Sequence, residues 1–306
     1  MDVRTLRVAQ VGYGEVGRIF GAALAARGVR DVSAFDVRLL EAPWAADARS
    51  RAKRDGVRLE ARLDDALRDA GLVVSAVTAA STAQAASQVA AACARDAFVL
   101  DVNSASPRTK AQCAETVERA GARYVEAAVM AAVSPYGIRV PMLLGGPHAA
   151  ALQPALEALG FDAKVGSPKY GVVSAIKLCR SVIIKGTEAL AVESLLAARR
   201  YGVEAEVLAS LRESFPGMDW DAQGSYYWKR VVQHGRRRAE EMREAATTMR
   251  DAGLAGAMSA AAAEVQAWIA ALRDEGAFEA APRDAGWRDY ADLVDAATSA
   301  KKRRAG

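Results

Sequence analysis

The stretch VGYGEVG, residues 11–17, decides how the first half of this chain is interpreted. It places Gly12, Gly14 and Gly17 in a GxGxxG spacing, after a β-branched run and at the start of an Ala-rich helical pattern. In that context Gly12 permits a tight turn, Gly14 lets the backbone approach a pyrophosphate, and Gly17 permits close helix packing. The stretch therefore predicts a strand, a dinucleotide-binding turn and a helix.

Short β-branched runs alternate with helical segments around this stretch, which predicts a doubly wound, mostly parallel sheet. The runs expected to be strands are 6–11, 31–35, 57–60, 72–77, 97–102, 123–129, 138–146 and 161–166. After Ser167-Pro168, strand signals nearly vanish and long helical patterns follow, beginning with a helix over about 172–200. We therefore expect an α/β Rossmann domain over residues 1–167 and an all-α domain over residues 168–306.

The composition is that of an ordinary globular protein, with 52% hydrophobic and 25% charged residues. The formal net charge of +4 is too small to call for nucleic acid as a partner. The cysteines, Cys93, Cys113 and Cys179, form no CxxC pair, and there are only two histidines, so we expect no disulfide framework and no metal site.

Residues 70–94 carry no charge and are long enough to span a bilayer. Their first part is β-branched and their second part is Ala-rich, which predicts a strand followed by a helix instead of a membrane segment. The N-terminal segment lacks the apolar core of a signal peptide. We therefore expect a cytoplasmic protein with no membrane association.

Asp36 follows the second expected strand, 19 residues after Gly17. A carboxylate at this place can accept hydrogen bonds from both ribose hydroxyls, which favours NAD over NADP. Arg38 could instead meet a 2′-phosphate, which leaves NADP open. The candidate cofactor-binding residues are Gly12, Tyr13, Gly14, Glu15, Val16, Gly17, Asp36, Val77 and Thr78.

Lys177 is the best candidate for a general acid/base. It lies near the start of the long expected helix, in a segment apolar enough to be buried between the domains. Burial and the like charge of Arg180, three residues on, would favour the neutral amine. Ser181, four residues on, shares the same helix face and could orient the amine or contact the substrate. The alternative is a solvated surface lysine.

Together these features resemble the β-hydroxyacid dehydrogenase family, which includes 3-hydroxyisobutyrate and 6-phosphogluconate dehydrogenases. The resemblance rests on VGYGEVG, on LDVNSASPRTK at residues 100–110, and on the lysine of the long helix. It implies that Lys177 is the general acid/base, that Ser104 lies near the nicotinamide and the substrate carboxylate, and that Ser181 replaces the usual asparagine. It also implies hydride transfer between NAD(P) and a small 3-hydroxy acid or sugar acid.

The family's Ser-Gly-Gly turn, which binds the substrate carboxylate, corresponds here to Met130, Ala131 and Ala132. Substrate binding at this turn is therefore expected to be altered. The helical domain is similar to that of a bacterial variant of the family, which implies a homodimer formed through it.

Basic residues of the helical domain can reach the active sites of such relatives, which makes His234 and Arg237 candidates for binding an anionic substrate. Three consecutive arginines, 236–238, point in three directions, so at most one or two can face one site. Alternatively they form a solvated basic face paired with Glu240 and Glu241.

Two further hypotheses stay open. An imine reductase shares this architecture, although such proteins usually lack the lysine, so Lys177 counts against this alternative. A non-catalytic dinucleotide-binding sensor would explain the altered turn at Met130 and the missing asparagine. Whether decarboxylation follows oxidation is not encoded in any motif of the chain.

Overall fold

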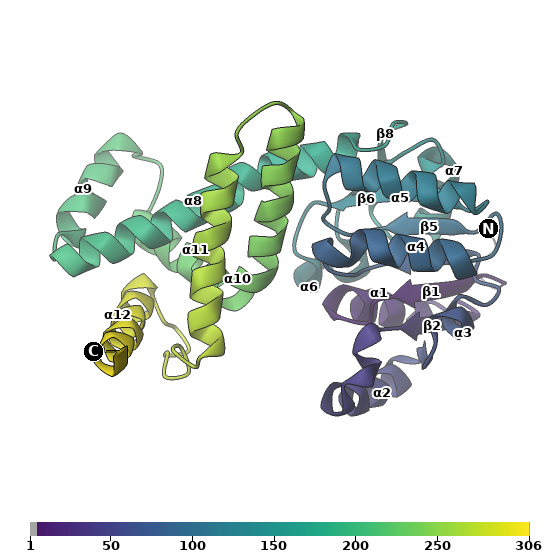
Figure 1. The fold of residues 1–306 in the computed structure, drawn as a ribbon, viewed down its shortest axis with the longest axis horizontal. Helices are drawn as coiled ribbons and strands as arrows, with labels where there is room; N and C mark the ends of the chain where they lie inside the picture. Colours follow the sequence, from purple (N-terminus) through teal and green to yellow (C-terminus); the bar gives the residue numbers. More distant parts are fainter. Residues whose placement is uncertain (1–4, 306) are drawn as a thin grey trace. The chain divides into compact units, whose positions relative to one another are not determined.

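The structure of the chain, a computed structural model, describes residues 5–305, with side chains as far as residue 299. The chain forms two compact units, residues 1–178 and 179–306 (Figure 1). The division between the units falls inside the long helix α8 (Val172–Tyr201). The domain boundary expected from the sequence, at 167/168, coincides with the end of strand β8 (Ala163–Ser167).

The first unit contains an eight-stranded sheet within the described residues, in the order β3-β2-β1-β4-β5-β6-β7-β8. Its other strands are β1 (Arg7–Val11), β2 (Asp31–Phe35), β3 (Arg58–Leu59), β4 (Leu72–Ser75), β5 (Phe98–Asp101), β6 (Arg123–Val129) and β7 (Met142–Gly145). Neighbouring strands are parallel except β6 and β7, which pair antiparallel. The doubly wound, mostly parallel sheet predicted from the sequence is confirmed.

Helices cover both faces of this sheet. They are α1 (Glu15–Ala26), α2 (Ala42–Asp55), α3 (Leu63–Leu67), α4 (Thr82–Ala92), α5 (Pro107–Arg119), α6 (Val133–Tyr136) and α7 (Ala149–Ala158), with short 3₁₀ turns η1 (Val37–Leu40), η2 (Ala79–Ser81) and η3 (Gly137–Arg139). Side chains of α1, α2 and α7 pack into one core layer, and those of α3, α4 and α5 pack into the other. Successive residues of a strand point to opposite faces, so Val8 joins the first layer and Ala9 the second.

Strand β7 is shorter than the expected run over 138–146. Residues Gly137–Arg139 form the turn η3 instead, with Gly137 at φ +59°, a conformation that glycine adopts readily. Pro141 has no N–H to donate to a strand ladder, although its carbonyl still accepts from Met130 N at 2.9 Å. The regular ladder with β6 therefore begins at Met142.

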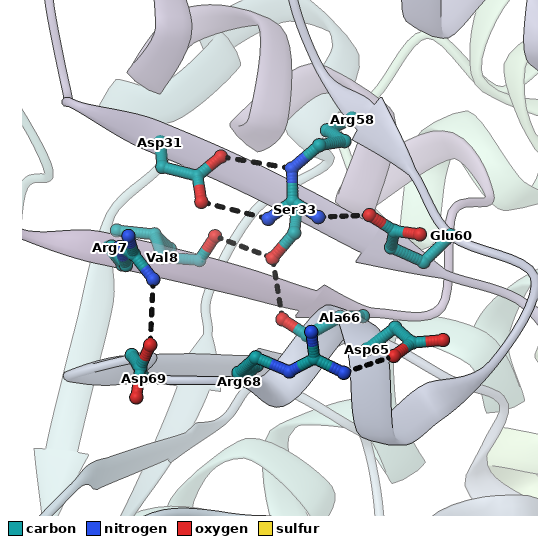
Figure 2. A network of polar contacts seen from close by, with 10 residues as sticks. All are labelled: Arg7, Val8, Asp31, Ser33, Arg58, Glu60, Asp65, Ala66, Arg68 and Asp69. Carbon is teal, nitrogen blue, oxygen red and sulfur yellow. Dashed lines mark hydrogen bonds and ion pairs between the residues drawn. The ribbon is translucent and has the colours of Figure 1, made fainter.

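A network of ion pairs lies at the amino ends of β1, β2 and β3 (Figure 2). Arg58 pairs with both Asp31 and Glu60. Arg7 pairs with Asp69 at 2.8 Å. These side chains are between 23% and 71% exposed, so solvent screens the pairs and each contributes little to stability. The glycine turn follows the carboxyl end of β1, so this network lies at the opposite edge of the sheet.

The second unit is built from helices throughout its described residues, as predicted. After α8 come α9 (Glu204–Ser214), α10 (Trp220–Asp251), α11 (Ala257–Asp274) and α12 (Trp287–Ala305). Gly235 allows α10 and α11 to approach closely, because a Cβ there would lie 2.6 Å from the Gln266 carbonyl oxygen. Trp228 and Trp287 are fully buried in the core of this unit.

Among the described residues, no helix combines the length and the apolar character needed to cross a bilayer.

Candidate active site

The glycine turn after β1 is shaped by close contacts. Gly12 has φ +93°, and a Cβ there would lie 2.3 Å from the carbonyl oxygen of Ala76. A Cβ on Gly17 would lie 1.9 Å from the carbonyl oxygen of Gly12. At Gly14, by contrast, a Cβ would meet no atom within 4 Å. Gly12 and Gly17 are therefore required by the fold itself, whereas Gly14 borders open space that a ligand could enter.

Helix α1 begins at this turn without a side-chain cap on its N-cap residue, Gly14. The first N–H groups of a helix have no partner within the helix, and together with the helix dipole they favour an anion. Glu15 is exposed and Val16 is half-buried against the core. The open cradle at Gly14 and the uncapped helix fit the pyrophosphate of a dinucleotide.

Tyr13 turns its side chain into the protein interior, where 3% of the residue is exposed. Burial, with a smaller contribution from Asp55, raises the pKa of Tyr13 to about 12. Its hydroxyl has no hydrogen-bond partner among the described residues. The backbone N–H of Tyr13 donates to Asp36 Oδ2 at 2.7 Å. In this structure Tyr13 therefore contributes its backbone to the turn, while its ring belongs to the core.

Asp36 ties the glycine turn to the end of β2. Besides the bond from Tyr13, its Oδ1 accepts from the backbone N–H of Arg38 at 2.9 Å. Each carboxylate oxygen keeps further lone-pair capacity, so a ribose hydroxyl could still donate to it. The Arg38 guanidinium pairs with Glu41 at 3.0 Å and lies 4.9 Å from the ring centroid of Trp44. The carboxylate and the arginine that bear on cofactor choice thus both lie just beyond β2.

Lys177 and Ser104 are brought together in the first unit. Lys177 Nζ donates to Ser104 Oγ at 2.6 Å, although the two residues are 73 positions apart in the sequence. Lys177 lies in the first two turns of α8, and Ser104 lies in the loop between β5 and α5. Both side chains are partly buried, which leaves them accessible to a small molecule.

A buried polar network fixes the loop that carries Ser104. Asp101, at the end of β5, accepts from Lys110 Nζ at 2.7 Å, from the backbone N–H of Asn103 at 2.9 Å and from the Tyr124 hydroxyl at 2.6 Å. Lys110 and Tyr124 are fully buried. Burial, reinforced by Asp101, raises the pKa of the Tyr124 hydroxyl well above its ordinary value. The carboxylate therefore holds the loop against the sheet.

Asn103 connects this loop to the end of β4. Its side-chain Oδ1 accepts from the backbone N–H of Val77 at 2.7 Å, and its Nδ2 donates to Ser75 Oγ at 3.0 Å. The Thr78 hydroxyl contacts Ser81 Oγ at 3.1 Å at the start of η2. One asparagine thus links Val77, a candidate cofactor contact, to the loop that carries Ser104.

Asp101, Asn103, Lys110 and Tyr124 were not expected from the sequence to be parts of the site. Asp101, Asn103 and Lys110 lie inside the segment LDVNSASPRTK. The available local signal there is Asp101, a charged residue at the end of an apolar strand. The complete burial of Lys110 has no local signal, because it depends on Asp101, nine residues earlier.

The segment Met130–Ala132 lies between β6 and α6. Met130 and Ala131 are half-buried and Ala132 is exposed. None of the three has a side-chain hydrogen-bond donor. Any polar contact from this turn to a substrate would therefore come from the backbone.

Ser181, His234 and Arg237 lie in the second unit. Ser181 Oγ accepts from Lys185 Nζ at 3.0 Å, and Lys185 pairs with Glu241 at 2.7 Å. Burial lowers the pKa of Lys185, while Glu241 opposes that shift. Arg237 is exposed and also pairs with Glu241, at 2.6 Å with i,i+4 spacing, but Glu241 itself is buried, so this pair is only partly solvated. His234 is half-buried on the same helix, α10.

The buried ion pairs of this unit were not anticipated from the sequence. Arg238 and Glu188 pair with both side chains almost fully buried. Lys185 and Glu241 are each about nine-tenths buried. Their partners lie on different helices, α8 and α10, so spacing along the chain gives no indication of the pairing.

Comparison with known families agrees with this architecture. The NAD binding domain of 6-phosphogluconate dehydrogenase matches residues 7–165, just over half of the chain. A domain of unknown function, DUF1932, matches residues 198–269 in the helical unit. The chain therefore has an NAD(P)-binding domain and belongs to the β-hydroxyacid dehydrogenase family. A search of curated proteins found no match.

Solved structures share the fold over nearly the whole chain. A conserved hypothetical protein from Sinorhizobium meliloti is 35% identical, with a TM-score of 0.73 over 96% of this chain and 97% of that one. The 3-hydroxyisobutyrate dehydrogenase of Mycobacterium tuberculosis is 19% identical, with a TM-score of 0.68 over 87% and 94%. A reductive aminase from Aspergillus terreus is 18% identical, with a TM-score of 0.55 over 95% and 99%. The last two likenesses concern the fold alone.

Proposed function

We propose that this protein is an NAD(P)-dependent oxidoreductase that transfers a hydride between nicotinamide and the alcohol carbon of a small 3-hydroxy acid or sugar acid. Lys177 is its general acid/base. The observation that carries this proposal is the 2.6 Å hydrogen bond from Lys177 Nζ to Ser104 Oγ. This bond connects two proposed roles. Lys177 is proposed to move the proton, and Ser104 is proposed to lie beside the nicotinamide.

The dinucleotide supplies the carbon that accepts or donates the hydride. The turn formed by residues 12–17 would hold its pyrophosphate through backbone N–H groups. Asp36 would accept from the ribose, which favours NAD, and Arg38 would meet a 2′-phosphate if NADP binds. Val77 and Thr78, which follow β4, would line the same edge of the sheet.

During oxidation Lys177 takes the proton from the substrate hydroxyl, and during reduction it returns that proton. Ser104 accepts a hydrogen bond from the lysine and can donate its own proton to the substrate, so it orients both groups. Ser181 is proposed to orient the amine of Lys177 or to contact the substrate, and its hydroxyl, which accepts a hydrogen bond from Lys185, keeps its own proton to donate.

Substrate recognition is proposed to involve three regions. The segment Met130–Ala132 offers apolar side chains and backbone groups. His234 and Arg237 are proposed to supply positive charge for an anionic substrate, and Arg237 would then exchange its bond with Glu241 for one with that anion.

We also propose a homodimer formed through the helical unit and a cytoplasmic location. Helix α8 exposes Ile183 (69%) and Leu190 (56%), seven positions apart and therefore on one face, which supports association of apolar surfaces. The three cysteines are free, which is typical of a reducing compartment.

The test is nicotinamide absorbance during incubation with NAD, and separately with NADP, across a panel of 3-hydroxy acids, sugar acids and cyclic imines. Turnover of a hydroxy acid that falls by about 100-fold or more in Lys177→Ala supports the proposal. Turnover of imines alone would favour the imine reductase alternative, which the fold shared with the reductive aminase motivates. Cofactor binding without turnover of any substrate would favour a dinucleotide-binding sensor.

A further inference from the structure

Glu126, on the interior strand β6, is a carboxylate with 0% exposure. Its Oε2 accepts from the backbone N–H of Gly171 at 3.0 Å and from Ser174 Oγ at 3.2 Å, and the backbone N–H of Val173 also donates to this carboxyl group. Helix α8 begins at Val172. Glu126 therefore accepts hydrogen bonds from donors at the start of α8 that have no partner within the helix. It lies 45 positions before Gly171 in the sequence.

Two glycines make room for this anchor. A Cβ on Gly145 would lie 2.5 Å from Glu126 Oε1. A Cβ on Gly146 would lie 2.1 Å from the ring of Tyr170, the residue that precedes Gly171. The Tyr170 hydroxyl shares its proton between Glu118 Oε1, at 2.5 Å, and the carbonyl oxygen of Tyr124, also on β6, at 2.9 Å. The segment that leads into α8 is thus fixed to the sheet at two successive positions.

This anchor has an energetic cost. Glu126 Oε1 has no hydrogen-bond partner among the described residues. Burial raises the pKa of Glu126, although Lys110 and the hydrogen bonds from the start of α8 oppose that rise. An apolar side chain of similar size would avoid the cost of desolvating a carboxylate. What the carboxylate provides in return is a fixed position for the start of α8.

Lys177 lies three residues after Ser174, about one helical turn beyond the anchored residues and on the same side of α8. The first turn of a helix frays when its donors lose their partners, and a displacement of about 1 Å at a reacting group can cost about 100-fold in rate. The position of Lys177 Nζ against Ser104 therefore depends on what holds the turn before it.

We propose that Glu126 is a positioning residue: by binding the first turn of α8, it fixes Lys177 in hydrogen-bond contact with Ser104. This inference rests on the proposed role of Lys177. It adds a carboxylate that touches neither substrate nor cofactor and acts through the helix that carries the lysine.

The test compares Glu126→Gln, which keeps an acceptor oxygen, with Glu126→Leu, which keeps the size and loses the acceptor. Asp219→Ala is the matched control, because it removes a side-chain N-cap from α10 in the other unit.

The measurements are kcat, KM, the Kd of NADH and thermal unfolding. A substrate-free readout is the pH profile of acetylation at Lys177 by acetic anhydride, followed by peptide mass spectrometry with exposed Lys164 as the reference.

We expect Glu126→Leu to lower kcat by about 10-fold or more while the Kd of NADH changes by less than about 2-fold, because the lysine and not the cofactor turn is displaced. The acetylation profile of Lys177 should change in Glu126→Leu, and Glu126→Gln should restore both kcat and the profile toward wild type. Asp219→Ala should change neither. Wild-type kcat and an unchanged profile in folded Glu126→Leu would overturn the inference.

Should Glu126→Leu fail to fold, Ser174→Ala decides the question, since it removes one donor to Glu126 and leaves the carboxylate in place. An unchanged acetylation profile and unchanged kcat in Ser174→Ala would then contradict the inference. The proposed function fails separately, if Lys177→Ala turns over substrate at the wild-type rate. In that case the acetylation profile still reports whether Glu126 controls the surroundings of Lys177.

Discussion

Lys177 Nζ lies 2.6 Å from Ser104 Oγ, in a hydrogen bond that joins the start of α8 to the loop after β5. Buried groups of the same unit fix the segments that carry both residues. Asp101 and Asn103 fix the loop, and Glu126 binds the first turn of α8. The contact is therefore set by the sheet, and its two side chains remain partly accessible.

Asn103→Ala is expected to weaken NADH binding by about 5- to 20-fold, because the backbone N–H of Val77 and the hydroxyl of Ser75 both lose a partner. Fluorescence titration of NADH measures this effect. Thr116→Ala, which removes an exposed hydroxyl on α5, is the control and should leave the affinity unchanged. Equal affinities in wild type and Asn103→Ala would contradict the assigned link between the two loops.

Cofactor preference should depend on the two residues beyond β2. Asp36→Asn is expected to reduce the NAD to NADP ratio of kcat/KM by about 10-fold or more, because a charged acceptor for the ribose hydroxyls is lost. Arg38→Ala should reduce turnover with NADP more than with NAD. Asp36 also holds Tyr13 and Arg38, so Asp36→Asn should unfold at a lower temperature. A ratio that does not change in either variant would argue against this part of the site.

Tyr13→Phe should fold as stably as wild type, or more stably by about 1 kcal/mol, because the buried hydroxyl has no partner among the described residues. Thermal or denaturant unfolding measures this difference, and the Kd of NADH should not change. A loss of more than about 2 kcal/mol would mean that the hydroxyl makes a hydrogen bond in solution.

Thiol labelling should distinguish the cysteines. Burial, with a further contribution from Asp101, raises the pKa of Cys113 to about 12, and only the thiolate reacts. Native Cys113 should therefore resist iodoacetamide at pH 8, and its reactivity should rise only as the pH approaches that value. Exposed Cys179 should be labelled first. Mass spectrometry of the labelled peptides checks the order, and rapid labelling of Cys113 in folded protein would contradict its burial.

The parts of the fold that local patterns determine could be predicted from the sequence. The run over 31–35 forms β2 and the run over 123–129 forms β6, with the expected bounds. The glycine turn has the contacts that its spacing implied at Gly12 and Gly17. The breaks between the helices of the second unit follow glycine and proline signals, as at Pro216-Gly217.

The supporting groups of the site could not be predicted, because their pairing depends on the finished fold. Glu126 contacts residues 45 and 48 positions away, and a single acidic residue within the run RYVEAAV does not by itself indicate which groups it will bind. Ser181 accepts a hydrogen bond from Lys185, one turn further along α8, and this contact was not expected from the sequence. The start of β7 depends on η3 and Pro141, which an apolar run does not indicate.

The rate of hydride transfer in a single turnover shows whether Lys177 moves the proton. Enzyme saturated with cofactor is mixed with a substrate identified by the panel, and nicotinamide absorbance is followed in wild type and in Lys177→Ala. This role of Lys177 predicts a rate at least about 100-fold lower in the variant with an unchanged Kd of NADH, because the proton acceptor is lost while the cofactor turn stays intact. A wild-type rate in Lys177→Ala would contradict it.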